Sequence, residues 1–115
     1  MLTEPRTINV LGTEIKVLFR EEKQDPKLEE LGGYFDATEN LIVVKIPEKD
    51  SMSVGNLENH QKKVLRHEII HAFMFESGLG ANWEHKPIGH EETTIDWIAA
   101  QFPKLLEVFE KVGAL

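Results

Sequence analysis

Cysteine is absent from this chain of 115 residues, so disulfides and thiolate metal ligands are both excluded. This absence fits an intracellular setting, and we expect a cytoplasmic protein. The sequence also lacks a long hydrophobic run and the features of a secretion signal, so no membrane span is expected. Basic residues are few: 13 Lys and Arg against 20 Asp and Glu give a net charge of −7, which argues against a nucleic-acid-binding surface.

The rest of the composition is that of a globular protein, with 41% hydrophobic and 29% charged residues. Its length predicts a single domain spanning 1–115. Alternating or β-branched runs predict strands at residues 7–11 and 13–19, joined in a tight hairpin, and at 33–36 and 41–46, joined in a second one. Two helical segments follow. The expected fold class is α+β, with a small, curled antiparallel sheet packed on the two helices.

The first helical segment contains the most informative residues of the chain, His67-Glu68-Ile-Ile-His71. Neither Gly nor Pro interrupts the surrounding sequence, which predicts a helix starting between residues 54 and 57 and ending at Ser77, before Gly78. Two histidines four residues apart lie on one face of a helix, so both imidazoles can bind one metal ion. This is the HExxH arrangement of zinc hydrolases, in which the glutamate acts as general base.

A catalytic zinc site keeps three protein ligands, so a third ligand must come from another part of the chain. The metzincin pattern, with a third histidine six residues after the second, fails because Ser77 and Met74 occupy the positions that would hold His and Gly. The alternative is a carboxylate on a later helix, which the segment 90–99 supplies. Pro103 lies in the continuation of this segment and predicts a kink or a break there.

Glu92, Asp96 and Ala99 in this later segment match the spacing of the glutamate helix in the gluzincin metallopeptidases. The chain resembles that family, and in size it is most similar to the ImmA/IrrE-type and phage-encoded minimal zincins. The resemblance implies a zincin-like domain with Glu92 as the third zinc ligand. Asp96, one turn later, would accept a hydrogen bond from the second nitrogen of a ligand histidine, and the small Ala99 would let the two helices approach closely.

Glu91 is an alternative to Glu92 as the third ligand. On a helical wheel Glu91 lies nearer the middle of the apolar face of its segment, a position that also suits a ligand. Glu92 is favoured because only Glu92 has a carboxylate four residues later that can support a histidine. Considered alone, each glutamate would simply suit the positive end of a helix dipole.

The expected function is that of a zinc-dependent metallopeptidase with Zn²⁺ on His67, His71 and Glu92 and with Glu68 as general base. The substrate would be a peptide or a protein, bound in extended form along an edge strand of the sheet. The candidate for that strand is residues 41–46. The sequence leaves the specificity, the pathway and the oligomeric state open.

The residue that would stabilise the oxyanion is also open: Tyr34, His85 and His90 are candidates, and no spacing distinguishes them. His60 is expected on the surface. Two other functions compete with catalysis. One is a metal-binding regulatory or interaction module with little proteolytic activity, and the other is a metal-free helical core in which the motif is accidental.

Overall fold

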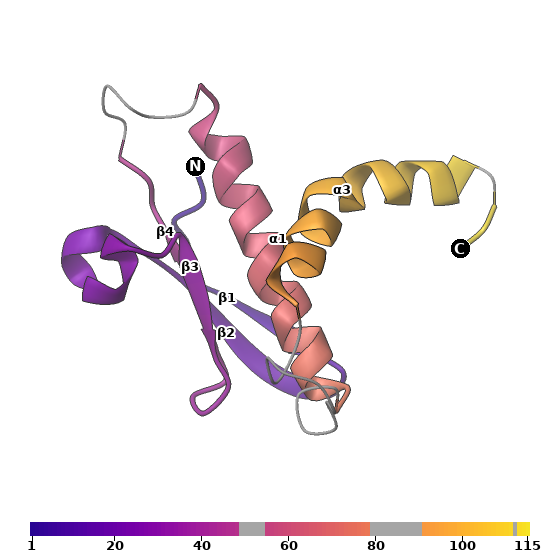
Figure 1. Cartoon of the computed structure of the whole chain (residues 1–115). Helices are drawn as coiled ribbons and strands as arrows, with labels where there is room; N and C mark the ends of the chain where they lie inside the picture. The colour runs from indigo at the N-terminus through magenta and orange to yellow at the C-terminus, as the bar shows by residue number, and fades with distance from the viewer. Residues whose placement is uncertain (49–54, 79–90, 112) are drawn as a thin grey trace.

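The structure is a computed structural model that describes residues 1–48, 55–78, 91–111 and 113–115. Its elements follow in the order of four strands and then two long helices (Figure 1). In chain order these are β1 (Arg6–Val10), β2 (Thr13–Arg20), η1 (Glu22–Gln24), η2 (Pro26–Glu29), β3 (Gly33–Asp36), β4 (Leu41–Lys45), α1 (Leu57–Glu76) and α3 (Glu92–Lys111). The predicted α+β class is confirmed.

Both predicted hairpins are present in the sheet. Strands β1 and β2 pair antiparallel across a two-residue turn in which Leu11 and Gly12 have positive φ angles of 51° and 95°. Two positive φ angles in succession match the twist of a two-residue hairpin, and glycine adopts such an angle at no steric cost. Strands β3 and β4 also pair antiparallel.

The sheet as a whole is mixed, because its strand order is β1-β2-β4-β3 and the two central strands, β2 and β4, run parallel. The expectation of an entirely antiparallel sheet is therefore wrong. The expectation that residues 41–46 form an edge strand is also wrong, since β4 pairs with a neighbour on each side. Its central residues Ile42, Val43 and Val44 are fully buried, as is typical of a strand covered on both faces. The edge beside β4 is formed by β3.

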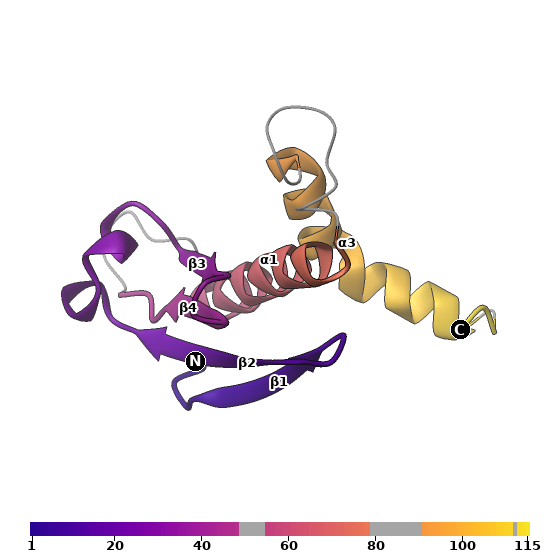
Figure 2. The ribbon, with the colours of Figure 1, turned by 90° about the horizontal axis from the view of Figure 1, so that it is seen from below.

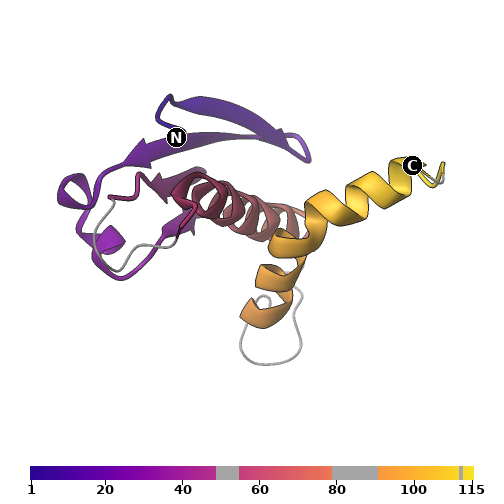
Figure 3. The same cartoon turned by 90° about the horizontal axis from the view of Figure 1, so that it is seen from above.

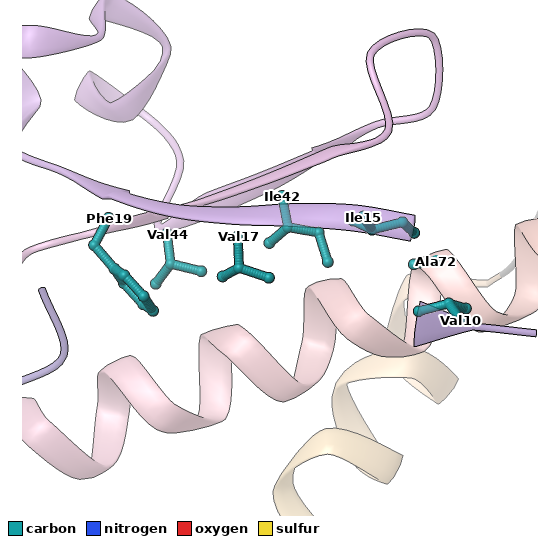
Figure 4. Packing of buried hydrophobic residues seen from close by; sticks show 7 residues of the cluster. All are labelled: Val10, Ile15, Val17, Phe19, Ile42, Val44 and Ala72. Atoms are coloured by element: carbon teal, nitrogen blue, oxygen red, sulfur yellow. The ribbon is translucent and has the colours of Figure 1, made fainter. Parts of the chain in front are cut away.

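Helix α1 covers one face of the sheet, and α3 packs on α1 (Figures 2 and 3). The core lies between the sheet and α1, where the inward side chains of the strands point at the helix (Figure 4). These buried side chains are Val10, Ile15, Val17, Phe19, Ile42, Val44 and, on α1, Ala72. Alternate residues of a strand face the same side, so this one set of apolar residues defines the face that α1 covers.

The helix boundaries follow from local signals in the sequence. Helix α1 begins after Asn56, whose side chain accepts a hydrogen bond of 3.0 Å from the amide of Asn59. Its last residue is Glu76, one residue before the predicted Ser77, and Gly78 follows with φ 93°. Helix α3 continues through Pro103 and changes direction along its length (Figure 2), so of the predicted kink or break the structure has the kink.

Within the described residues, neither α1 nor α3 combines the length and the apolar character required to cross a bilayer.

Candidate metal centre

The two motif histidines lie one turn apart on α1 and point toward the same place. Their ring centroids are 4.8 Å apart, and the distance between His67 Nε2 and His71 Nε2 is 3.1 Å. Both side chains are largely covered, with 17% and 16% of their surface exposed. Their placement follows directly from the four-residue spacing, which brings two side chains together on one helical face.

Glu92, in the first turn of α3, brings a carboxylate to both imidazoles. Its Oε1 lies 2.9 Å from His71 Nε2, and its Oε2 lies 3.1 Å from His67 Nε2. The candidate ligand atoms of the three residues all lie within 4.8 Å of one another. The structure therefore joins the two motif histidines to Glu92, a residue 25 positions away from His67 in the sequence.

The separations between these atoms fit a small cation. Ligand atoms placed about 2.0 Å from a tetrahedral zinc ion lie about 3.3 Å from one another. The observed separations are 2.9, 3.1 and 3.1 Å. Hydrogen bonds alone satisfy these three side chains poorly. If both neutral imidazoles donated from Nε2 to the Glu92 carboxylate, their two N–H groups would lie against each other. A divalent cation at the centre would satisfy all three contacts together.

Glu91 has a different role. Its Oε1 accepts a hydrogen bond of 3.2 Å from the amide of Thr93, and its Oε2 accepts one of 2.6 Å from the hydroxyl of Thr94. These bonds lower the pKa of the Glu91 carboxyl group, the Thr94 hydroxyl contributing most. Glu91 thus satisfies donors at the start of α3. Of the two alternatives left open by the sequence, it is Glu92 that lies against the imidazoles.

Asp96 lies beside His67, one turn after Glu92 on α3. Its Oδ1 is 3.5 Å from His67 Nδ1, the nitrogen that faces away from Glu92, and its Oδ2 is 3.2 Å from Lys63 Nζ. Sequence reasoning missed Lys63, although its position one turn before His67 places it on the same helical face. A carboxylate that accepts a hydrogen bond from a metal-binding histidine orients its imidazole, and Asp96 lies on the side of His67 where such a partner is needed.

Ala99 lies where the two helices meet, as its size suggested. Its side chain is fully buried. Its carbonyl oxygen accepts a hydrogen bond of 2.7 Å from Arg66 Nε of α1. This contact fixes the position of α3, and with it that of Glu92, relative to the motif helix.

Glu68 is the buried carboxyl group of this region, with 7% of its surface exposed. Burial, and secondarily the charge of Glu92, raise the pKa of Glu68 to about 7. Strand β3 lies close by: a methyl group added at Gly33 would be 3.5 Å from Glu68 Cγ and 2.8 Å from the carbonyl oxygen of Val43. Glycine at this position therefore lets the edge strand approach the motif helix beside Glu68.

The raised pKa predicts how the stability of the metal-free protein depends on pH. Between pH 4.5 and pH 7 the unfolded chain releases the Glu68 proton and the folded chain retains it. The contribution of Glu68 to the free energy of unfolding therefore decreases as the pH rises, by about 3 kcal/mol in total. The test is denaturant titration with a chelator present. Between pH 5 and pH 8 the free energy of unfolding of Glu68→Gln, measured relative to that of the wild type, should rise by about 2–3 kcal/mol. An equal difference between the two proteins at both pH values would contradict this assignment.

A cleft of about 610 Å³ opens at the three converging residues. Its walls are formed by β3 and the residues before it, by one face of α1 and by the first turns of α3. His60, exposed as expected, belongs to its wall. The candidate metal centre is therefore accessible from solvent, and Glu68 contributes to the same cleft.

Tyr34 also lines this cleft, but its hydroxyl group is engaged elsewhere. It donates a hydrogen bond to Asp25, which also accepts one of 3.1 Å from Arg20. Burial and the Asp25 carboxylate raise the pKa of Tyr34 to about 12. The hydroxyl thus helps to hold the segment before β3 and is poorly placed to donate to an oxyanion. The other two candidates, His85 and His90, lie outside the described residues.

Comparison of the chain with protein-family models, with curated proteins and with solved structures gives no match.

Proposed function

We propose that the protein is a zinc-dependent metallopeptidase of the gluzincin type, with His67, His71 and Glu92 as zinc ligands. The observation that supports this most directly is the convergence of two Nε2 atoms and one carboxylate at separations of 2.9–3.1 Å. The cleft at this group provides space for a substrate. The donor set of two imidazoles and one carboxylate is that of a catalytic zinc site with an open fourth position.

A zinc ion held there would supply Lewis acidity, which lowers the pKa of water and polarises a peptide carbonyl. Glu68 would remove a proton from the attacking water and deliver it to the nitrogen of the leaving amine. Asp96 would hold His67 in the orientation and tautomer that bind metal.

Strand β3 would pair with an extended substrate, in place of the residues 41–46 expected from the sequence. The carbonyl oxygen of Gly32 accepts a hydrogen bond of 2.8 Å from Lys45. In an antiparallel pair, successive residues direct their backbone N–H and C=O groups alternately toward and away from the partner strand. Since Gly32 faces β4, Gly33 and Phe35 direct these groups away from it. A peptide paired with these groups would lie across the cleft beside Glu68.

Metal content and metal dependence test this proposal together. Protein purified without added zinc should carry about one zinc ion per chain, measured by elemental analysis. It should cleave unstructured peptides supplied as a mixture, and mass spectrometry should detect the products. Removal of the metal by a chelator should stop cleavage, and stoichiometric zinc should restore it while magnesium should not, because nitrogen ligands favour zinc. A metal-free protein with unchanged cleavage would refute the proposal.

A further inference from the structure

A second hollow of about 280 Å³ adjoins the cleft at the N-terminal half of α1. The two share wall residues from the segment before β3 and from α1: Glu30, Leu31, Gly32, His60 and Val64. A chain bound along β3 in the cleft therefore passes the opening of this hollow at Gly32. The hollow is a candidate subsite for one side chain of the substrate.

Apolar side chains form about half of the walls of this hollow. Leu31, Pro47, Leu57 and Val64 contribute to them, and none of these four side chains is fully buried. Leu31 is 47% exposed. Apolar surface of this kind gains free energy when the hydrocarbon part of a ligand covers it.

The charge of the hollow is negative. Glu29 and Glu30 line it, both are exposed, and among the described residues neither carboxylate has an ion-pair partner. Lys45, the one lysine or arginine on the described walls, has its Nζ 3.4 Å from the Oε2 of Glu22. Two carboxylates are thus available to a ligand, whereas the neighbouring cation is already paired.

We infer that this hollow binds a lysine or arginine side chain of the peptide substrate; this inference rests on the proposed function. The aliphatic part of such a side chain would cover the apolar walls, and its cationic end would reach Glu29 and Glu30. Long basic side chains combine these two properties, whereas a leucine would leave the carboxylates unpaired and a glutamate would be repelled. The hollow therefore selects for charge as well as for length.

Peptide binding to the zinc-loaded Glu68→Gln protein tests the inference without requiring turnover. The probes are fluorescent, N-acetylated and C-amidated alanine peptides in which one lysine is moved through successive positions. Each is compared with peptides carrying norleucine, which has a similar stem without the charge, or glutamate at that position. At one position lysine should bind about fivefold more tightly than norleucine, and glutamate more weakly than either. The preference should decrease in high salt.

Two double variants locate the effect on the protein. Glu29→Gln with Glu30→Gln should abolish the preference for lysine over norleucine. Glu4→Gln with Glu14→Gln changes the net charge equally at exposed positions outside the hollow and should leave the preference intact. Equal binding of lysine and norleucine at every position would refute the inference while leaving the proposed function standing. If no peptide bound the zinc-loaded protein, the proposed function would fail, and the subsite with it.

Discussion

Replacing Glu68 with glutamine should abolish peptide hydrolysis while zinc remains bound. Glutamine has nearly the shape of glutamate, but it cannot accept the proton of the attacking water. Loss of a general base typically lowers the rate by a factor of about 10²–10⁴. The zinc ligands are left untouched, so elemental analysis should still give about one zinc per chain. The quantity to measure is kcat/KM for a peptide that the wild type cleaves.

Glu58→Gln is the matched control, because Glu58 is an exposed glutamate in the first turn of the same helix. It should cleave at the wild-type rate. Wild-type activity in Glu68→Gln would show that this carboxylate is not the base. If the wild type bound zinc and cleaved nothing, the protein would instead be a metal-binding module on the same scaffold.

The motif helix and its two histidines were predictable because the information is local. Four-residue spacing places His67 and His71 on one face of any helix, and Asn56 and Gly78 mark its ends by the side-chain and backbone properties of single residues. The two hairpins were predictable for the same reason. None of these features depends on which distant segments meet.

The order of the strands depends on distant pairing, and local patterns do not encode it. Strand β4 inserts between β2 and β3, so the chain returns to the sheet parallel to β2. One signal was available: Ile42, Val43 and Val44 are consecutive apolar residues, which is typical of a strand buried on both faces rather than of an edge. This pattern favours β3, and not β4, as the edge strand.

The choice between Glu91 and Glu92 illustrates a second limit of the sequence. The two residues are adjacent at a helix start, and a helical wheel assumes that both are already helical. In the structure α3 begins at Glu92, and Glu91 lies outside it and binds Thr93 and Thr94. A shift of one residue in the helix boundary thus decides which carboxylate faces α1. Similarly, the hydrogen bond between Tyr34 and Asp25 depends on the 3₁₀ turns before β3.

Glu92→Ala should remove zinc from the protein, and this change separates the two neighbouring glutamates. Alanine leaves His67 and His71 as the remaining ligands of the proposed site, and two imidazoles on one helix hold zinc weakly. Loss of a residue that only supports a ligand costs about 10- to 100-fold in metal affinity, so loss of a ligand should exceed about 100-fold. Competition with a chromophoric chelator would measure the change.

Glu91→Ala is the control on the adjacent residue. It removes hydrogen bonds at the start of α3, which should lower the free energy of unfolding slightly and leave zinc bound. The two variants carry the same change in charge and composition one residue apart, so an effect of net charge alone on zinc affinity would be equal in both. If Glu91→Ala lost zinc and Glu92→Ala kept it, the third ligand would be Glu91. If both kept it with wild-type affinity, the carboxylate beside the two imidazoles would not be a ligand, and a zinc site built on α1 and α3 would be refuted.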